Sequence, residues 1–163
     1  MPEGDTRVGW GYDAHPFGGD PPLILGGVVV SESAGVRATS DGDVLAHAVT
    51  DALLGACVHA DIGEHFPSDN ADLVDADSMH LLRQTAELAH EAGWQISHVD
   101  ATVVVEEIRI APHRDGMRAN LARALGVGDG SVSVKATTTD GLGFIGRGEG
   151  LAAVAVVTVT ALP

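Results

Sequence analysis

Residues 40–58, Ser-Asp-Gly-Asp-Val-Leu-Ala-His-Ala-Val-Thr-Asp-Ala-Leu-Leu-Gly-Ala-Cys-Val, predict the helix around which the rest of the chain is arranged. The opening Ser-Asp-Gly-Asp is typical of a helix start, because short polar side chains cap the free N–H groups of a first turn. The apolar residues that follow recur at helical spacing: Val44, Leu45, Ala48, Val49, Ala52, Leu53 and Ala56. The lone Cys57 shares this pattern, so we interpret it as a packing residue.

Segments rich in Val, Ile and Thr on both sides of this helix predict strands. Before it, residues 7–14 and 23–30 are expected to pair as a hairpin across a Gly- and Pro-rich turn, with a bulge at Gly26-Gly27. After it, a loop is expected at 60–76, helices at 78–92 and from Pro112 to about Gly126, and strands at 95–105, 131–137 and 151–160. The order predicts one α+β domain over residues 1–163, with a mixed β-sheet and helices packed on one face.

Charge limits the classes of partner. The 163 residues hold 23 acidic and 9 basic side chains, a formal net charge of −14, so neither nucleic acid nor an anionic membrane is an expected partner. The N-terminus has no apolar leader, and the longest apolar stretch, residues 151–162, is interrupted by Thr158 and Thr160. We therefore expect a cytoplasmic protein, and an anionic ligand would need bound metal or local donors to neutralise it.

Two short patterns carry candidate metal ligands. Asp13 and His15 stand two apart at the end of a predicted strand, so their side chains point the same way. On the predicted helix, Asp43, His47 and Asp51 form a polar stripe at intervals of four residues. Three ligands, Asp13, His15 and His47, would leave a fourth position open, as in catalytic zinc sites, with a carboxylate orienting the second His47 nitrogen. The alternatives are an ordinary polar strand end and a solvent-facing helix edge.

A third pattern is the run at residues 135–150, Lys-Ala-Thr-Thr-Thr-Asp-Gly-Leu-Gly-Phe-Ile-Gly-Arg-Gly-Glu-Gly. Its glycines allow close backbone approach, and its hydroxyls and N–H groups favour binding of phosphate or a metal–phosphate. A plain Gly-rich hairpin loop is the alternative. Lys135 is equally consistent with a phosphate ligand and with a solvated lysine on the strand.

These segments, together with Thr50-Asp-Ala-Leu-Leu-Gly-Ala56, Asp61-Ile-Gly63 and Phe66-Pro67, resemble the 2-C-methyl-D-erythritol 2,4-cyclodiphosphate synthase family in order and over nearly the whole chain. The resemblance implies a homotrimer with active sites at subunit interfaces. It implies Zn²⁺ on Asp13, His15 and His47, and a second divalent cation, Mg²⁺ or Mn²⁺. The implied reaction converts 4-diphosphocytidyl-2-C-methyl-D-erythritol 2-phosphate to the 2,4-cyclodiphosphate and releases CMP, in the non-mevalonate isoprenoid pathway.

The resemblance also implies residue roles. Thr39 and Thr138 would be catalytic, and Asp140 would help to bind the second cation. The implied substrate-binding residues are Ser40, Asp61, Ile62, Gly63, Phe66, Asn70, Val105, Arg109, Ile110, Ala111, Thr137, Thr138, Thr139, Phe144 and Arg147. Residues 105–111 would bind cytidine for the neighbouring subunit. Phe144, Arg147 and Glu149 would face the trimer axis, where the family can hold an isoprenoid diphosphate.

The chain departs from the family pattern near the reacting phosphates and the nucleotide. Thr39 stands where the family commonly has His, Ile108 replaces Pro, Glu106 and Glu107 are added, and the acidic residues after Phe66-Pro67 are shifted. Two alternative functions follow. One is a divergent relative that releases CMP from another cytidylyl polyol phosphate, and the other is a non-catalytic trimer that binds isoprenoid diphosphate.

Overall fold

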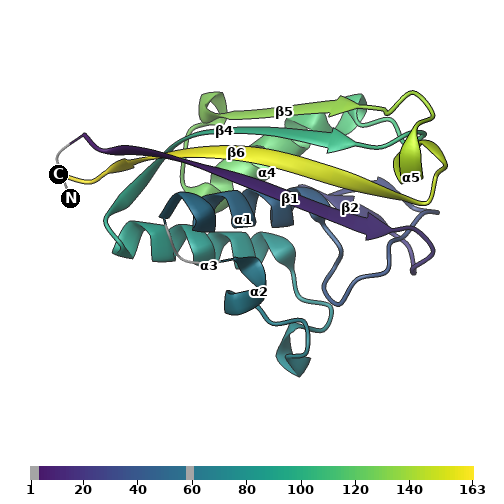
Figure 1. The fold of residues 1–163 in the computed structure, drawn as a ribbon, viewed down its shortest axis with the longest axis horizontal. Coiled ribbons are helices and arrows are strands. Elements are labelled where there is room, and N and C mark those ends of the chain that lie inside the picture. The colour runs from purple at the N-terminus through teal and green to yellow at the C-terminus, as the bar shows by residue number, and fades with distance from the viewer. Residues whose placement is uncertain (1–3, 58–60) are drawn as a thin grey trace.

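A four-stranded mixed sheet is the frame of the protein in the computed structural model, which describes residues 4–57 and 61–163. The strands lie in the order β1 (Thr6–Pro16), β6 (Gly150–Ala161), β4 (Trp94–Val104) and β5 (Val132–Thr137) (Figure 1). β6 is antiparallel to β1 and β4, whereas β4 and β5 are parallel. Therefore β1, β4 and β5 run in one direction, with their C-terminal ends at the same end of the sheet, although β1 and β5 are its two outermost strands. The predicted α+β class and mixed sheet are confirmed.

The predicted hairpin between residues 7–14 and 23–30 is wrong. β1 pairs instead with β6 along its whole length, from Thr6 opposite Thr160 to Pro16 opposite Gly150. The second segment divides into β2 (Leu23–Leu25) and β3 (Val28–Ser31), which form their own small sheet. Gly26 and Gly27 are the turn between them rather than a bulge, since both have positive φ, 55° and 68°, as a tight hairpin turn requires. A strand as long as β6 offers β1 far more backbone partners than β2 could.

Three helices cover one face of this sheet: α1 (Val44–Cys57), α3 (Ser78–Glu91) and α4 (Arg114–Leu125) (Figure 1). All three were expected, although the predicted end of the first at Val58 lies outside the described residues. Asp77 caps α3 by accepting the Met79 N–H at 2.9 Å. Gly93 follows α3 and Gly126 ends α4, both with positive φ, where a residue without Cβ is favoured.

Short helical turns occupy the connections. The segment expected to be loop at 60–76 contains α2 (Ile62–His65) and the 3₁₀ turn η1 (Ala71–Leu73), and residue 60 lies outside the described part. The turns η2 (Ala111–His113) and η3 (Asp129–Ser131) flank α4, and α5 (Gly143–Gly146) lies within the Gly-rich run. Capping explains the two earlier turns, because Asp61 and Asn70 each accept an N–H of the turn that follows.

The helix α1 lies directly against the inner face of β1. A Cβ atom at Gly11 would stand 2.1 Å from the Ala48 carbonyl oxygen, and one at Gly9 would stand 1.8 Å from that of Ala52. Only glycine fits there. Because side chains alternate along a strand, the residues that continue this inner face are Asp13 and His15. The close approach therefore brings α1 to the end of β1.

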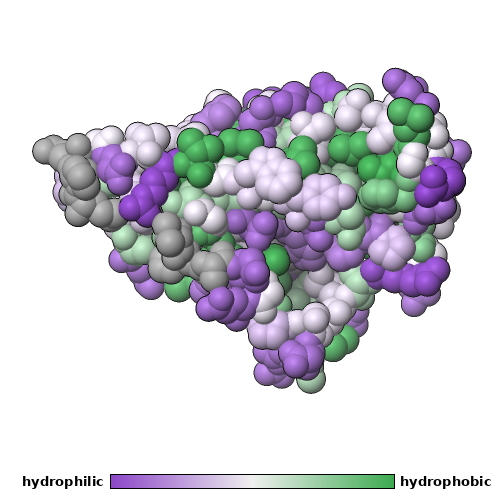
Figure 2. Space-filling view, in the orientation of Figure 1, coloured by the Kyte–Doolittle hydropathy of each residue, from purple (hydrophilic) through white to green (hydrophobic). Residues whose placement is uncertain are grey.

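Among the described residues, none of the helices α1, α3 and α4 covers the opposite face of the sheet. Large apolar side chains are exposed there on β1 and β6: Val8 at 66%, Trp10 at 63%, Tyr12 at 46% and Val156 at 36%. Trp10 and Tyr12 stack with centroids 6.2 Å apart. Apolar side chains accordingly gather along these strands in Figure 2. Among the described helices, none has the length and apolarity needed to span a membrane.

Candidate metal centre and its cavity

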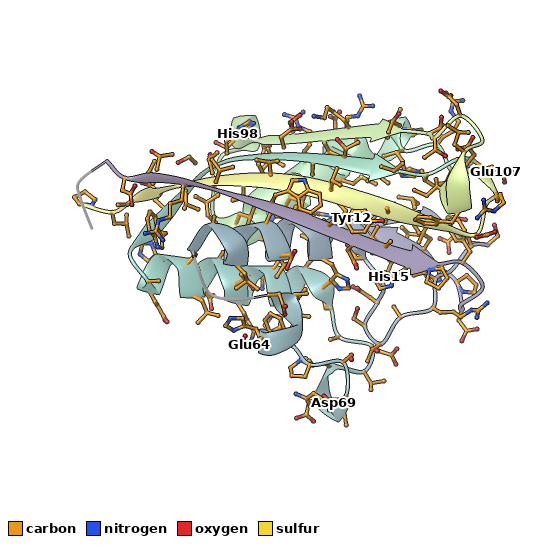
Figure 3. All side chains as sticks on the ribbon, in the orientation of Figure 1. Tyr12, His15, Glu64, Asp69, His98 and Glu107 are labelled. Atoms are coloured by element: carbon orange, nitrogen blue, oxygen red, sulfur yellow. The ribbon has the colours of Figure 1, made fainter. Side chains whose placement is uncertain are left out.

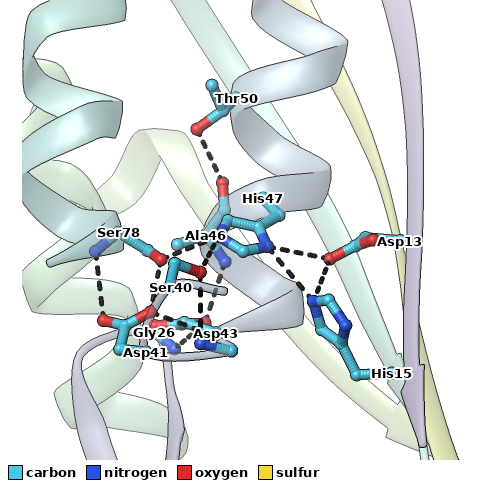
Figure 4. Close-up of polar contacts among 11 residues, drawn as sticks. Asp13, His15, Gly26, Ser40, Asp41, Asp43, Ala46, His47, Thr50 and Ser78 are labelled. Carbon is cyan, nitrogen blue, oxygen red and sulfur yellow. Dashed lines mark hydrogen bonds and ion pairs between the residues drawn. The ribbon is translucent and has the colours of Figure 1, made fainter. Parts of the chain in front are cut away.

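Asp13, His15 and His47 meet at the end of β1. The Asp13 Oδ2 atom lies 3.0 Å from His15 Nε2 and 2.9 Å from His47 Nδ1, and the two nitrogens are 3.5 Å apart (Figure 4). The strand supplies Asp13 and His15 on one face, and the first turn of α1 supplies His47. The structure thus brings together the three ligands that the sequence predicts, from positions more than thirty residues apart.

The three ligand atoms fit a small divalent cation. A tetrahedral zinc site with bonds of about 2.0–2.1 Å places neighbouring ligand atoms about 3.4 Å apart. The observed separations, 2.9, 3.0 and 3.5 Å, are close to that value without any rearrangement of the backbone. Two nitrogens and one oxygen suit zinc, and three protein ligands leave one coordination position open to a substrate. Asp13, His15 and His47 therefore form a group whose geometry and chemistry fit a metal ion.

Electrostatics keep Asp13 ready to bind a cation. Burial alone would raise the pKa of Asp13, but the hydrogen bonds and charges of His15 and His47 lower it to about 2. Burial likewise disfavours a charged His47, yet the hydrogen bond and charge of Asp13 outweigh it, so the pKa of His47 lies above its usual value. Asp13 is consequently ionised at neutral pH and the group concentrates negative charge where a cation would sit.

Two serine hydroxyls orient the other nitrogen of His47. His47 Nε2 lies 2.8 Å from Ser78 Oγ and 3.2 Å from Ser40 Oγ. Ser78 is fully buried and donates its proton to Asp41, which also accepts the Ser78 N–H at 3.0 Å. The Ser78 oxygen is then left to accept a hydrogen bond from the Nε2–H group, so that Nδ1 can bind a metal.

This arrangement corrects the sequence-based expectation that a carboxylate lies directly behind His47. The carboxylate of Asp41 acts through the Ser78 hydroxyl instead. Sequence reasoning missed Ser78, because it lies 31 residues beyond His47 and reads only as the first residue of a helix. The signal that distinguishes Ser78 is the full burial of its polar side chain, and burial cannot be seen in the sequence.

The other two residues of the polar stripe hold backbone in place, so the stripe is not a solvent-facing edge. Asp43 is fully buried and accepts N–H groups from Gly26 at 2.9 Å, Gly27 at 2.8 Å and Ala46 at 3.0 Å. Burial raises the pKa of Asp43 to about 6, and these three donors limit the rise. Burial also raises the pKa of Asp51, a shift that its backbone hydrogen bonds oppose. Asp43 thus fastens the turn between β2 and β3 to the start of α1.

His15 and His47 of this group border a cavity of about 540 Å³. Seven predicted site residues line it: His15, Thr39, Ser40, His47, Ile62, Gly63 and Phe66. The remaining lining residues, which are not among the predicted site residues, are Pro67, Ser68, Asp69, Leu73 and Leu81. In Figure 3 His15 stands at the end of β1 and Asp69 on the segment beyond α2, and Figure 2 shows the surface hollowed between these parts. Asp61 and Asn70 lie beside the cavity as helix caps.

The remaining predicted residues lie at the ends of β4 and β5, apart from this cavity. Val105 lines a second cavity of about 540 Å³ with Glu106, Glu107 and Ile108. Ile110 is buried, whereas Arg109 and Ala111 are exposed. The strand ends are joined where the Val105 N–H donates to the Thr137 carbonyl at 3.0 Å. A single chain therefore presents two separate halves of the predicted site.

Four N–H groups of the Gly-rich run are hydrogen-bonded within the chain. The N–H groups of Thr139 and Gly141 donate to Glu106, that of Asp140 to Thr138 Oγ1, and that of Leu142 to the Thr139 carbonyl. These four donors are already used within the chain. The threonine hydroxyls and, through a cation, Asp140 remain among the groups of this run that could contact a phosphate.

The basic residues of this region are paired. Lys135 Nζ lies 2.6 Å from the carboxylate of Asp100 on the outer face of the sheet, as the strand-face interpretation of this lysine predicts. Arg147 Nε lies 2.7 Å from Glu149 Oε1, and both side chains are exposed. The charge of Arg147 lowers the pKa of Glu149 through this hydrogen bond. Phe144 is 40% exposed beside them.

Comparison with known proteins agrees with this geometry. The model of the YgbB family matches residues 6–160. The 2-C-methyl-D-erythritol 2,4-cyclodiphosphate synthase of Salinibacter ruber is 52% identical over 153 residues, which are 94% of this chain and 98% of the relative. The synthase of Syntrophomonas wolfei is 49% identical, with 94% of this chain and 98% of the relative covered.

Solved structures also match this chain over nearly its whole length. The bifunctional IspDF from Campylobacter jejuni has a TM-score of 0.96 at 39% identity, over 99% of this chain and 44% of that longer chain. The CDP complex of IspF from Plasmodium falciparum has a TM-score of 0.84 at 29% identity, over 97% of each chain. Taken with the matched residues 6–160, these likenesses show that the chain belongs to the YgbB family, that of the 2-C-methyl-D-erythritol 2,4-cyclodiphosphate synthases.

Proposed function

We propose that this protein converts 4-diphosphocytidyl-2-C-methyl-D-erythritol 2-phosphate to 2-C-methyl-D-erythritol 2,4-cyclodiphosphate and releases CMP. The observation that carries the proposal is the Asp13, His15 and His47 group, which faces a 540 Å³ cavity in a chain half identical to enzymes of that name. The reaction joins the 2-phosphate to the β-phosphorus of the same molecule, so it requires positioning and charge neutralisation rather than a protein nucleophile.

Zn²⁺ on Asp13, His15 and His47 would supply Lewis-acid polarisation and neutralise phosphate charge. The chain's own groups define where the reacting phosphates lie. Thr39 and Ser40 line the same cavity as His15 and His47, and their hydroxyls would donate neutral hydrogen bonds to phosphate oxygens. The apolar lining residues Ile62, Phe66 and Leu81 would keep water from competing as a nucleophile once substrate fills the cavity.

The second half of the site would come from a neighbouring subunit. Thr137, Thr138 and Asp140 lie at the end of β5, on the opposite edge of the sheet from β1, so one chain does not close the site. In the proposed homotrimer, residues 105–111 of one subunit receive the cytidine while the metal group of the next holds the phosphates. Asp140 would bind the second cation, Mg²⁺ or Mn²⁺, because a hard carboxylate oxygen suits either ion.

The bare face of the sheet supports the trimer. Val8, Trp10 and Tyr12 expose large apolar surfaces there, which a free monomer rarely tolerates in one patch. Phe144 and the Arg147–Glu149 pair would then surround the threefold axis, where an isoprenoid diphosphate could bind. The absence of a spanning helix among the described residues is consistent with the proposed cytoplasmic location.

Purified protein tests the proposal directly. The protein is incubated with Zn²⁺, Mg²⁺ and the diphosphocytidyl substrate, and phosphorus NMR follows the products while analytical ultracentrifugation gives the oligomeric state. Cyclic diphosphate and CMP from a trimer are expected. CMP binding without turnover of this substrate would instead favour the divergent relative, and neither binding nor turnover would favour the non-catalytic trimer.

A further inference from the structure

Glu106 holds the loop that follows β5. Its Oε2 atom accepts the Thr139 N–H at 3.1 Å, and its Oε1 atom accepts the Gly141 N–H at 2.9 Å. The Thr139 hydroxyl is 3.3 Å from the same carboxylate, but its single proton is directed to the Leu142 carbonyl at 2.6 Å. One carboxylate thus bridges two backbone N–H groups on either side of Asp140.

Asp140 has an unusual backbone conformation between those two bonds. Its φ is +51°, in the left-handed region that residues with a Cβ seldom adopt. Such a conformation persists only when its surroundings enforce it, and it is frequent at functional sites. The Thr138 hydroxyl completes the arrangement, because it accepts the Asp140 N–H at 3.1 Å and lies 3.3 Å from Asp140 Oδ1.

The other side of this loop is also supported. A Cβ atom at Gly146 would lie 2.1 Å from the Gly141 carbonyl carbon, so α5 rests on the loop backbone. The backbone of this loop is therefore hydrogen-bonded to Glu106, which follows β4, and is packed against α5. Figure 3 places the neighbouring Glu107 at this same end of the molecule, beside α5.

The position of Glu106 in the chain matters as much as its contacts. It belongs to residues 105–111, the segment proposed to receive cytidine, whereas the loop it holds carries the groups proposed to receive the diphosphate and its cation. Charge complementarity gives no other reason for a carboxylate here, since a negative side chain beside a diphosphate repels it. A structural benefit must offset that repulsion.

We propose that Glu106 is a positioning residue that sets Asp140 and the Thr138 hydroxyl in their ligand-binding conformation and fastens the nucleotide segment to the phosphate loop. This role rests on the proposed function. Glu106 itself touches neither substrate nor cation. Its two backbone bonds fix the direction of the Asp140 carboxylate, and misplacing a substrate-positioning group by about 1 Å can cost about 100-fold in rate.

The test compares Glu106→Ala and Glu106→Gln with Glu107→Gln. Glu107→Gln is the charge control, because it removes the adjacent, exposed carboxylate of the same cavity wall and of the same proposed nucleotide segment. If only charge mattered, both Gln variants would bind the anionic substrate more tightly. We expect the opposite for Glu106: about 10- to 100-fold lower kcat for Glu106→Ala, a several-fold higher Mg²⁺ concentration for half-maximal turnover, and an intermediate Glu106→Gln, whose amide keeps one acceptor.

Two further measurements separate positioning from a general loss of structure. Hydrogen exchange should quicken at residues 139–141 in Glu106→Ala, while the melting temperature and zinc content stay at the wild-type values. An active wild type with an equally active Glu106→Ala variant, at the same Mg²⁺ dependence, would overturn this role alone. A wild type that releases no CMP would refute the proposed function and this role with it.

Discussion

The packing of α1 on β1 should make Gly11→Ala far more damaging than its single methyl group suggests. A Cβ atom at Gly11 would lie 2.1 Å from the Ala48 carbonyl oxygen, whereas real Cβ atoms keep at least about 3.0 Å from a neighbour. The helix must therefore move away by roughly 3.0 − 2.1 = 0.9 Å. Overpacking of this kind costs about 1–3 kcal/mol, or about 2–12 °C in melting temperature for a domain of this size.

The same displacement should weaken metal binding. His47 directly precedes Ala48, so a shift of about 0.9 Å separates His47 Nδ1 from Asp13 Oδ2, now 2.9 Å apart. Metal–ligand distances tolerate only about 0.2 Å of change. We therefore expect Gly11→Ala to lose zinc affinity together with stability, measured by competition with a chromogenic chelator and by thermal melting.

Gly55→Ala is the matched control. Gly55 lies on the same helix, and no atom of the described residues lies within 4 Å of a Cβ added there, so alanine should stabilise α1 by up to about 1 kcal/mol. A Gly11→Ala protein that melts and binds zinc as the wild type does would refute the steric reasoning, because the helix would then not be held against the strand as described.

Three other substitutions test the site. His47→Ala should abolish stoichiometric zinc while the oligomer persists, since two ligands hold the ion poorly, and full zinc occupancy by elemental analysis would contradict the ligand assignment. Ser78→Ala should weaken zinc binding by about 10- to 100-fold through loss of the bond that orients His47, whereas Thr85→Ala, a buried hydroxyl of the same helix bonded to its own backbone, should leave zinc affinity unchanged. Thr39→His should raise turnover several-fold, about 1 kcal/mol of barrier, because an imidazolium donates a charged hydrogen bond where the hydroxyl donates a neutral one; steady-state kinetics that show a tenfold loss would mean that the hydroxyl itself is required.

Local patterns were sufficient for the three long helices, α1, α3 and α4, and for the types of candidate ligand. The caps at Asp77 and the glycines at 93 and 126 mark helix ends because they act within one turn of backbone, so the sequence alone carries the signal. The two-residue spacing of Asp13 and His15 likewise determines that both face one side of a strand. These features need no knowledge of distant residues.

Distant pairing and burial were decided only by the tertiary structure. β1 pairs with β6, and the paired residues lie 134 to 154 positions apart along the chain. Strand length and backbone hydrogen bonding select this partner, and the local periodicity of β1 carries no information about a distant strand of matching length. For the same reason the buried Ser78 behind His47 and the Glu106 carboxylate bridging residues 139 and 141 were not foreseen. Each depends on which side chains the folded backbone brings within about 3 Å, a condition that no spacing along the chain encodes.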